Sequence, residues 1–253
     1  MKAIYMAGAA LLMFSSTVVA DVTGTEEFSF DVDPGARISV ENVNGDITVI
    51  GDSGSKVQVV AHKRAGKQEY LDKLEIVIDA SDDYVRIETQ HPDSNGGWFN
   101  WGNNSSGSVS YELLVPEDVD LDAIETVNGD VNVEAVSGEV KAGTVNGTVS
   151  VSGLVSDVDL ETVNGGIKAV FKELGAGQRV KADTVNGKIT IYLPADASAR
   201  VVAETVNGSI DADDFGLKVE KGFVGRDLNG EIGGGDASVS LDAVNGSIRI
   251  KKN

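Results

Sequence analysis

The sequence predicts an all-β protein whose main part is a parallel β-solenoid, or β-helix, with about 18–22 residues per coil. Three observations lead to this prediction. The phrase Val-Asn-Gly, once written Leu-Asn-Gly, occurs eight times. Apolar residues return at fixed positions around each copy. Helix-forming sequence is scarce, since only residues 65–74 (AGKQEYLDKL) could hold a helical turn.

The repeat is clearest in residues 125–169, which divide into five nonamers. Their third, seventh and ninth positions are apolar, and we expect all three to point inward. In alternate nonamers the third position is Val127, Val145 and Val163, so the full repeat has 18 residues in two halves. Equivalent positions of a solenoid stack from coil to coil. We therefore expect Val145→Asp to destabilise the fold strongly and Thr148→Lys, at an outward position, to be tolerated.

The Asn-Gly steps are predicted to form the corners of the coil. Asn and Gly tolerate positive φ, and stacked Asn amides can bond one another in a ladder. The predicted ladder contains Asn44, Asn128, Asn146, Asn164, Asn186, Asn207, Asn229 and Asn245. From Asn128 onward the spacings are 18, 18, 22, 21, 22 and 16 residues, which fit a coil with variable loops and aligned strands. The alternative is a meander of hairpins with type I′ turns.

Residues 21–120 differ from the repeats in residues 121–253, and we expect short strands there that cap or begin the coil. Pro34-Gly35 indicates a turn. Residues 74–90 alternate apolar and polar on both sides of Ser81-Asp82-Asp83, which predicts a hairpin. An open solenoid end exposes unpaired strand edges and needs such a cover. The two parts could form one continuous domain.

Residues 1–20 have the features of a signal peptide. Lys2 is followed by an apolar run at residues 7–14, which is too short to span a membrane. Val18 and Ala20 are small enough for cleavage between Ala20 and Asp21. We expect an exported protein, periplasmic, secreted or on the cell surface, with no transmembrane segment in the mature chain.

Composition limits the partners. The chain has 40 Asp and Glu against 21 Lys and Arg, a net charge of −19. Such a protein repels nucleic acid and anionic lipid, and favours cations, basic peptides or basic proteins. It has no Cys, which excludes disulfides and Cys-based zinc sites.

Acidic residues recur at the first position of the repeat. The residues concerned are Glu125, Glu161, Asp183, Glu204 and Asp242. Stacking would bring these carboxylates within about 5 Å of one another. A solvated face, a cation-binding ladder and the carboxylate pair of a glycan-cleaving enzyme all remain open. A calcium-binding coil is disfavoured, because the position after Asn-Gly varies and is once Lys188.

The sequence predicts no catalytic, cofactor-binding or metal-binding residue, and no cofactor. The sequence GDSG at residues 51–54 resembles a serine nucleophile motif but lies between two short strands, and we interpret it as a turn. A loop at residues 94–108 displays Trp98, Phe99 and Trp101 among Gly and polar residues. These rings could contact a sugar or a partner protein, or fold back as a lid.

Three long segments carry a family resemblance. They are FDVDPGARISVENVNGDITV (30–49), YELLVPEDVDLDAIETVNGDVNV (111–133) and LNGEIGGGDASVSLDAVNGSIRI (228–250), with TVNG-x-I repeated between them. The chain resembles the bacterial putative-adhesin β-solenoid domain family, whose function is unknown. The resemblance implies a right-handed parallel β-solenoid in the cell envelope or secreted space, and it brings no catalytic residues.

The leading hypothesis is a non-enzymatic exported envelope or secreted interaction protein, an adhesin-like acidic β-solenoid scaffold. Its expected partner is an envelope protein, a glycan or a basic peptide, and not nucleic acid. The alternatives are a polysaccharide-active β-helix enzyme and a cation-binding surface or matrix component.

Overall fold

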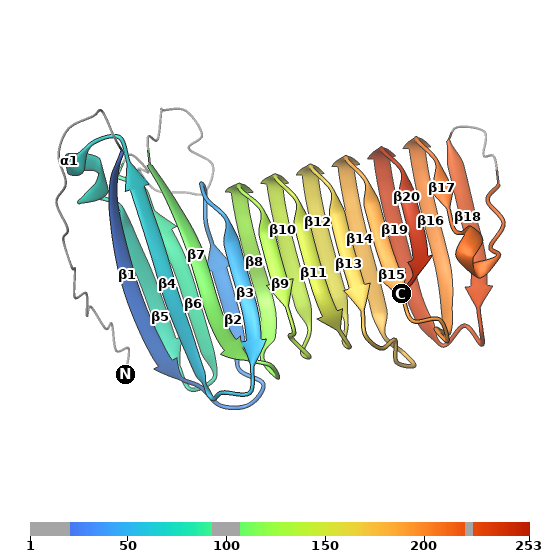
Figure 1. The fold of residues 1–253 in the computed structure, drawn as a ribbon, viewed down its shortest axis with the longest axis horizontal. Helices are drawn as coiled ribbons and strands as arrows, with labels where there is room; N and C mark the ends of the chain where they lie inside the picture. Colours follow the sequence, from blue (N-terminus) through green and yellow to red (C-terminus); the bar gives the residue numbers. More distant parts are fainter. Residues whose placement is uncertain (1–20, 93–106, 221–224) are drawn as a thin grey trace.

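The computed structural model describes residues 21–92, 107–220 and 225–253, and it consists mainly of two ten-stranded β-sheets (Figure 1). Sheet A contains, in spatial order, β1 (Val22–Asp31), β4 (Lys56–Ala65), β7 (Gly107–Pro116), β3 (Ile47–Asp52), β9 (Val131–Glu134), β11 (Val149–Leu154), β13 (Ile167–Phe171), β15 (Ile189–Leu193), β20 (Ile248–Lys252) and β17 (Ile210–Asp211). Sheet B contains β18 (Arg226–Ile232), β16 (Ala199–Asn207), β19 (Ala237–Asn245), β14 (Arg179–Asn186), β12 (Val158–Asn164), β10 (Val140–Asn146), β8 (Asp120–Asn128), β2 (Arg37–Glu41), β6 (Tyr84–Gln90) and β5 (Glu75–Ser81). Two short helical segments are α1 (Gln68–Leu71) and η1 (Asp213–Phe215).

Long parallel ladders dominate both sheets. The chain alternates between the sheets, so that Val140 of β10 lies opposite Val158 of β12, and Val149 of β11 lies opposite Ile167 of β13. This arrangement confirms the predicted all-β fold with parallel stacked strands. Near the N-terminus, β2 pairs with β8 and β3 pairs with β9, so both sheets run without a break across the boundary expected at residue 120.

The C-terminal strands occupy an unexpected place in the stack. β19 lies between β14 and β16, and β20 lies between β15 and β17. In Figure 1 these red strands precede the orange β16 and β17 along the long axis. The last repeats therefore do not stack in chain order. β18 runs antiparallel to β16 and places Asn229 opposite Val202, so Asn229 is not part of the asparagine ladder.

Side-chain size in the core explains this order. One inward row of sheet B alternates large and small residues from strand to strand: Ile124, Ala142, Leu160, Ala182, Leu241, Ala203 and Leu228. Stacking in chain order would place Ala182 directly against Ala203 and leave a void. Leu241 of the C-terminal strand fills that space, and close packing of this kind is what protein interiors require.

The Thr-Val-Asn-Gly step has its threonine inside and its valine outside. Thr144 is buried and its hydroxyl donates a 2.9 Å hydrogen bond to the carbonyl oxygen of Gly129. Thr162 makes the equivalent 3.0 Å bond to Gly147. Val163 is 40% exposed. The inward placement expected for Val127, Val145 and Val163 is therefore wrong, because period-2 alternation from buried residues such as Ala142 sets the orientation.

The asparagines form a hydrogen-bonded ladder along one corner. Each side-chain amide donates to the next asparagine's Oδ1 at 2.8–3.0 Å, in the order Asn207, Asn245, Asn186, Asn164, Asn146, Asn128 and Asn44. Positive φ is not the reason for these corners, since only Gly45 among the ladder turns has it. Glycine is needed for close stacking: a Cβ on Gly147 would lie 2.0 Å from the carbonyl oxygen of Gly129.

Antiparallel strands close the N-terminal end of the core. β1, β4 and β7 extend sheet A, and β5 and β6 form the hairpin predicted around Ser81.

A buried polar cluster lies beneath these end strands. The hydroxyls of Thr89 and Tyr111 are 2.7 Å apart, and Thr89 donates a 2.9 Å bond to Oδ1 of Asn42. Because Asn42 donates in turn to the carbonyl oxygen of Val109, these buried polar groups are satisfied.

Candidate functional site

The most distinctive surface of the described residues is a row of carboxylates on the outer face of sheet B. Pairing between strands aligns, in spatial order, Glu88, Glu41, Glu125, Glu161, Asp183, Asp242, Glu204 and Asp227. We call these residues the acid row. It brings together all five acids that the sequence singled out and adds Glu41, Glu88 and Asp227. Those three were missed because their neighbours depart from the Thr-Val-Asn-Gly phrase.

Few cations neutralise this row. Lys181 bonds Glu161 at 2.9 Å and Asp183 at 2.8 Å, and Arg86 bonds Glu41 at 2.6 Å. Within residues 21–92, 107–220 and 225–253, no ion pair is formed by Glu125, Asp242, Glu204 or Asp227. Strand spacing of about 4.8 Å places adjacent carboxylates close enough to repel.

This crowding changes protonation. Burial, together with the charges of Glu41 and Glu161, raises the pKa of Glu125. Burial also raises the pKa of Asp242, with smaller contributions from Asp183 and Glu204. Both carboxyl groups therefore bind a proton more readily in the folded protein than in the unfolded chain.

A stripe of outward valines runs beside the acid row, two residues further along each strand. We call Val145, Val163, Val185, Val244 and Val206 the valine stripe. Val206 is 46% exposed and Val244 is 42% exposed. Single exposed apolar residues are common on protein surfaces, but an aligned series of them is a feature of contact sites.

Six residues of the acid row, from Glu125 to Asp227, line one groove of about 580 Å³ together with the valine stripe. Its lining runs from Glu125 on β8 to Arg226 and Asp227 on β18. Carboxylates therefore follow one side of the groove and methyl groups follow the other. Such a surface suits a ligand with a cationic side and an apolar side.

Gly143 interrupts the acid row between Glu125 and Glu161. Neither sterics nor backbone conformation requires glycine there: a Cβ would meet only the carbonyl oxygen of Glu161, at an ordinary 3.5 Å, and φ is not positive. The missing side chain leaves an opening between two carboxylates. Glycine inside a strand lowers stability and often marks a place where a ligand approaches closely.

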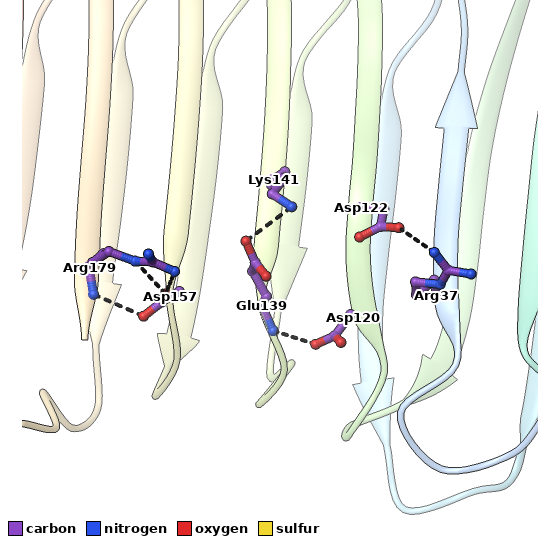
Figure 2. Close-up of polar contacts among 7 residues, drawn as sticks. All are labelled: Arg37, Asp120, Asp122, Glu139, Lys141, Asp157 and Arg179. Atoms are coloured by element: carbon purple, nitrogen blue, oxygen red, sulfur yellow. Dashed lines mark hydrogen bonds and ion pairs between the residues drawn. The ribbon is translucent and has the colours of Figure 1, made fainter. Parts of the chain in front are cut away.

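A neighbouring row of sheet B, nearer the strand starts, is neutralised internally (Figure 2). Its contacts are Arg37 with Asp122 at 3.9 Å, Lys141 with Glu139 at 3.1 Å, Arg179 with Asp157 at 2.7 Å, and the Glu139 N–H with Asp120 at 2.8 Å. Arg37, Lys141 and Arg179 therefore each pair with a carboxylate, while the Asp120 carboxylate accepts a backbone N–H. The acid row differs because, among the residues that the structure describes, most of its carboxylates form no ion pair.

The remaining candidates offer less chemistry. Asp130 uses its carboxylate to accept the backbone N–H of Thr148 at 2.7 Å, so it caps the next coil. In the part of the chain that the structure describes, no cluster of three His, Cys, Asp or Glu side chains could hold a metal ion. Trp98, Phe99 and Trp101 lie outside the described residues, as does the expected signal peptide at residues 1–20.

Comparison with known proteins assigns the family. The sequence model named Toastrack DUF4097 matches residues 102–251. The chain belongs to this family. The resemblance to a bacterial adhesin-like family of unknown function is thereby confirmed. In chain order, the matched residues include the strands from β7 to β19 and most of β20.

One solved structure resembles this chain in fold. A putative cell adhesion protein from Clostridium sporogenes is 19% identical, covers 90% of this chain and 100% of its own, and superposes with a TM-score of 0.51. A putative adhesin from Bacteroides fragilis (12% identity, 89% and 96% coverage, TM-score 0.42) and a putative lipid binding protein from Parabacteroides distasonis (13%, 89% and 96%, 0.34) are more distant. No curated protein matches this chain.

Among the described residues, no helix is long and apolar enough to cross a membrane.

Proposed function

We propose that this Toastrack protein is a non-enzymatic interaction scaffold of the cell envelope or secreted space, and that it binds a basic partner through the sheet B groove. The observation that carries the proposal is the alignment of six carboxylates beside the valine stripe in one groove. Like charges stacked across a sheet destabilise it, so the acid row gives no benefit to folding. A cationic partner would relieve this repulsion. The structural relative described as a putative cell adhesion protein agrees with a binding role.

We also infer finer features of the scaffold. Right-handed crossovers are strongly preferred between parallel strands of one sheet, which supports a right-handed coil. The ladder asparagines Asn128, Asn146, Asn164 and Asn186 are separated by 18, 18 and 22 residues, which supports coils of 18–22 residues. The pairing of β2 with β8 supports one continuous domain from residue 21 to 253.

Export is the third part of the proposal. The basic Lys2, the apolar run at residues 7–14 and the small residues before Asp21 support a cleaved signal peptide. N-terminal sequencing of the protein from its host should give Asp21 as the first residue. An intact Met1 would contradict export by this route.

Binding to isolated envelope material tests the function. The triple variant Glu125→Gln, Asp242→Asn, Glu204→Gln removes three charges from the acid row, and Glu27→Gln, Glu112→Gln, Glu134→Gln removes three from sheet A. We expect wild type to bind at low salt and to lose affinity at high salt, because screening acts on exposed charges. Only the first variant should lose binding. Equal loss of binding in both variants would mean that binding depends on net charge alone and not on the sheet B groove. Absence of binding by wild type would contradict the proposal.

A further inference from the structure

We propose that the groove accommodates a basic amphipathic α-helix of a partner protein, lying across the strands of sheet B with its apolar side on the valine stripe and its cationic side on the acid row. This inference rests on the proposed function and adds the class of partner. The exposed valines are its starting point, and the charge beside them restricts the occupant.

The repeat distance favours a helix over an extended peptide. Adjacent carboxylates are separated by the strand spacing, about 4.8 Å. Side chains on one face of a helix return every turn, about 5.4 Å. An extended chain brings side chains to the same face about every 6.8 Å. The helix therefore stays nearly in step with the coils, and flexible Lys and Arg side chains can absorb the small mismatch.

The length of the groove is also suitable. Six strand steps separate Glu125 on β8 from Asp227 on β18, or about 29 Å. A helix of about 19 residues has this length. Its apolar stripe would cover valines that are 40–46% exposed, from Val163 to Val206. Covering these methyl groups supplies the part of the binding energy that salt does not screen.

Gly143 gives the groove one specific feature. The opening there has carboxylates of Glu125 and Glu161 on its two sides. A planar guanidinium fits such a site because it can bond carboxylates on two sides while lying against the backbone. We therefore assign this opening to an arginine of the partner helix.

The first test uses a synthetic helical peptide of about 19 residues, with a leucine stripe beside an arginine stripe. A scrambled peptide of the same composition is the control for charge. We expect the full-length protein to bind the amphipathic peptide at least about tenfold more tightly than the scrambled one. Val163→Thr, Val185→Thr, Val244→Thr should remove this preference while keeping salt-dependent binding. The matched exposed changes Ile50→Thr and Val77→Thr should have no effect.

Failure of the inference and failure of the proposed function give different results. If both peptides bind equally and the threonine variant is unchanged, the acid row binds cations without recognising a helix, and this inference is wrong. If neither peptide binds at any salt concentration, the proposed function fails too. A dimer in gel filtration that the threonine variant abolishes would assign the stripe to a second copy of this chain, and would also overturn the inference.

The second test fills the opening. Gly143→Val should keep or raise the thermal midpoint, since valine favours strands, while it weakens binding of the arginine peptide several-fold. Ser150→Val on sheet A is the matched control and should leave binding unchanged. If Gly143→Val binds the arginine peptide as tightly as wild type does, the assignment of a partner arginine to this opening is wrong.

Discussion

The two outer faces of the solenoid are built by the same coils, yet they carry different chemistry. At equivalent outward positions sheet A has Glu112, Thr48, Asn132, Ser150, Lys168, Thr190, Arg249 and Asp211. Sheet B has the acid row. Neutral and basic side chains separate the two acids of this row, Glu112 and Asp211, whereas carboxylates stack next to one another on the second face. Since sheet A shows that stacking does not need acids, the acid row is better explained by a partner than by folding.

Substitutions in the core that both faces share should lower the free energy of unfolding most. Leu241 lies between Ala182 and Ala203 in its row, so neither neighbour can fill the space it leaves. We expect Leu241→Ala to lower the free energy of unfolding by about 4 kcal/mol. Val244→Ala, outward on the same strand, should cost less than about 1 kcal/mol. Urea titration measures both, and similar losses would contradict the inward and outward assignment.

A smaller effect is expected at the Thr-Val step. Thr162→Val removes the hydroxyl that bonds the carbonyl oxygen of Gly147, and should cost about 1–2 kcal/mol. The adjacent Val163→Thr changes an exposed side chain and should cost less than about 0.5 kcal/mol. Thermal unfolding of the two variants provides the comparison. A greater loss from Val163→Thr would restore the original inward placement of valine.

Val145→Asp tests the revised orientation directly. Its side chain is outward and half-buried, so we expect a loss below about 1 kcal/mol in urea rather than unfolding. The inward Leu160→Asp on the next strand is the control and should prevent cooperative folding. A severe loss from Val145→Asp would show that the valine stripe is covered in solution.

The smallest effect concerns pH. The pKa of Glu125 and that of Asp242 are raised in the folded state, so ionisation of either group lowers stability. Stability should therefore rise as pH falls from neutral through the raised folded pKa values, and the gain is complete below the ordinary values of 4.5 and 3.8. Relative to Glu125→Gln, Asp242→Asn, wild type should gain stability over this range. If the stability of wild type and that of the double variant change with pH in the same way, the repulsion assigned to the acid row is wrong.

Much of the stack could be predicted from the sequence because its repeats are local. The spacing of Asn128, Asn146 and Asn164 places equivalent residues in adjacent coils whatever the rest of the chain does. The alignment of the five repeated acids in adjacent coils follows from the same register. Period-2 alternation from the buried Ile124 would also have placed Thr126 inside. The hydrophobicity of the neighbouring Val127 favoured the opposite orientation, in which the valine points inward.

Other features depend on contacts between distant segments. The place of β19 depends on Leu241 fitting between Ala182 and Ala203, which no local pattern reveals. Asn229 has the ladder phrase but lies on an antiparallel strand. The opening at Gly143 has meaning only once Glu125 and Glu161 are its neighbours in space.

The most direct test asks which face the partner contacts. The chain has no cysteine, so Ser240→Cys beside the groove and Ser150→Cys on sheet A can each carry a single environment-sensitive dye. Titration with the arginine–leucine helix should change the emission of the dye at residue 240 and leave the dye at residue 150 unchanged. An equal change at both positions, or a change only at residue 150, would contradict the assignment of sheet B as the contact surface.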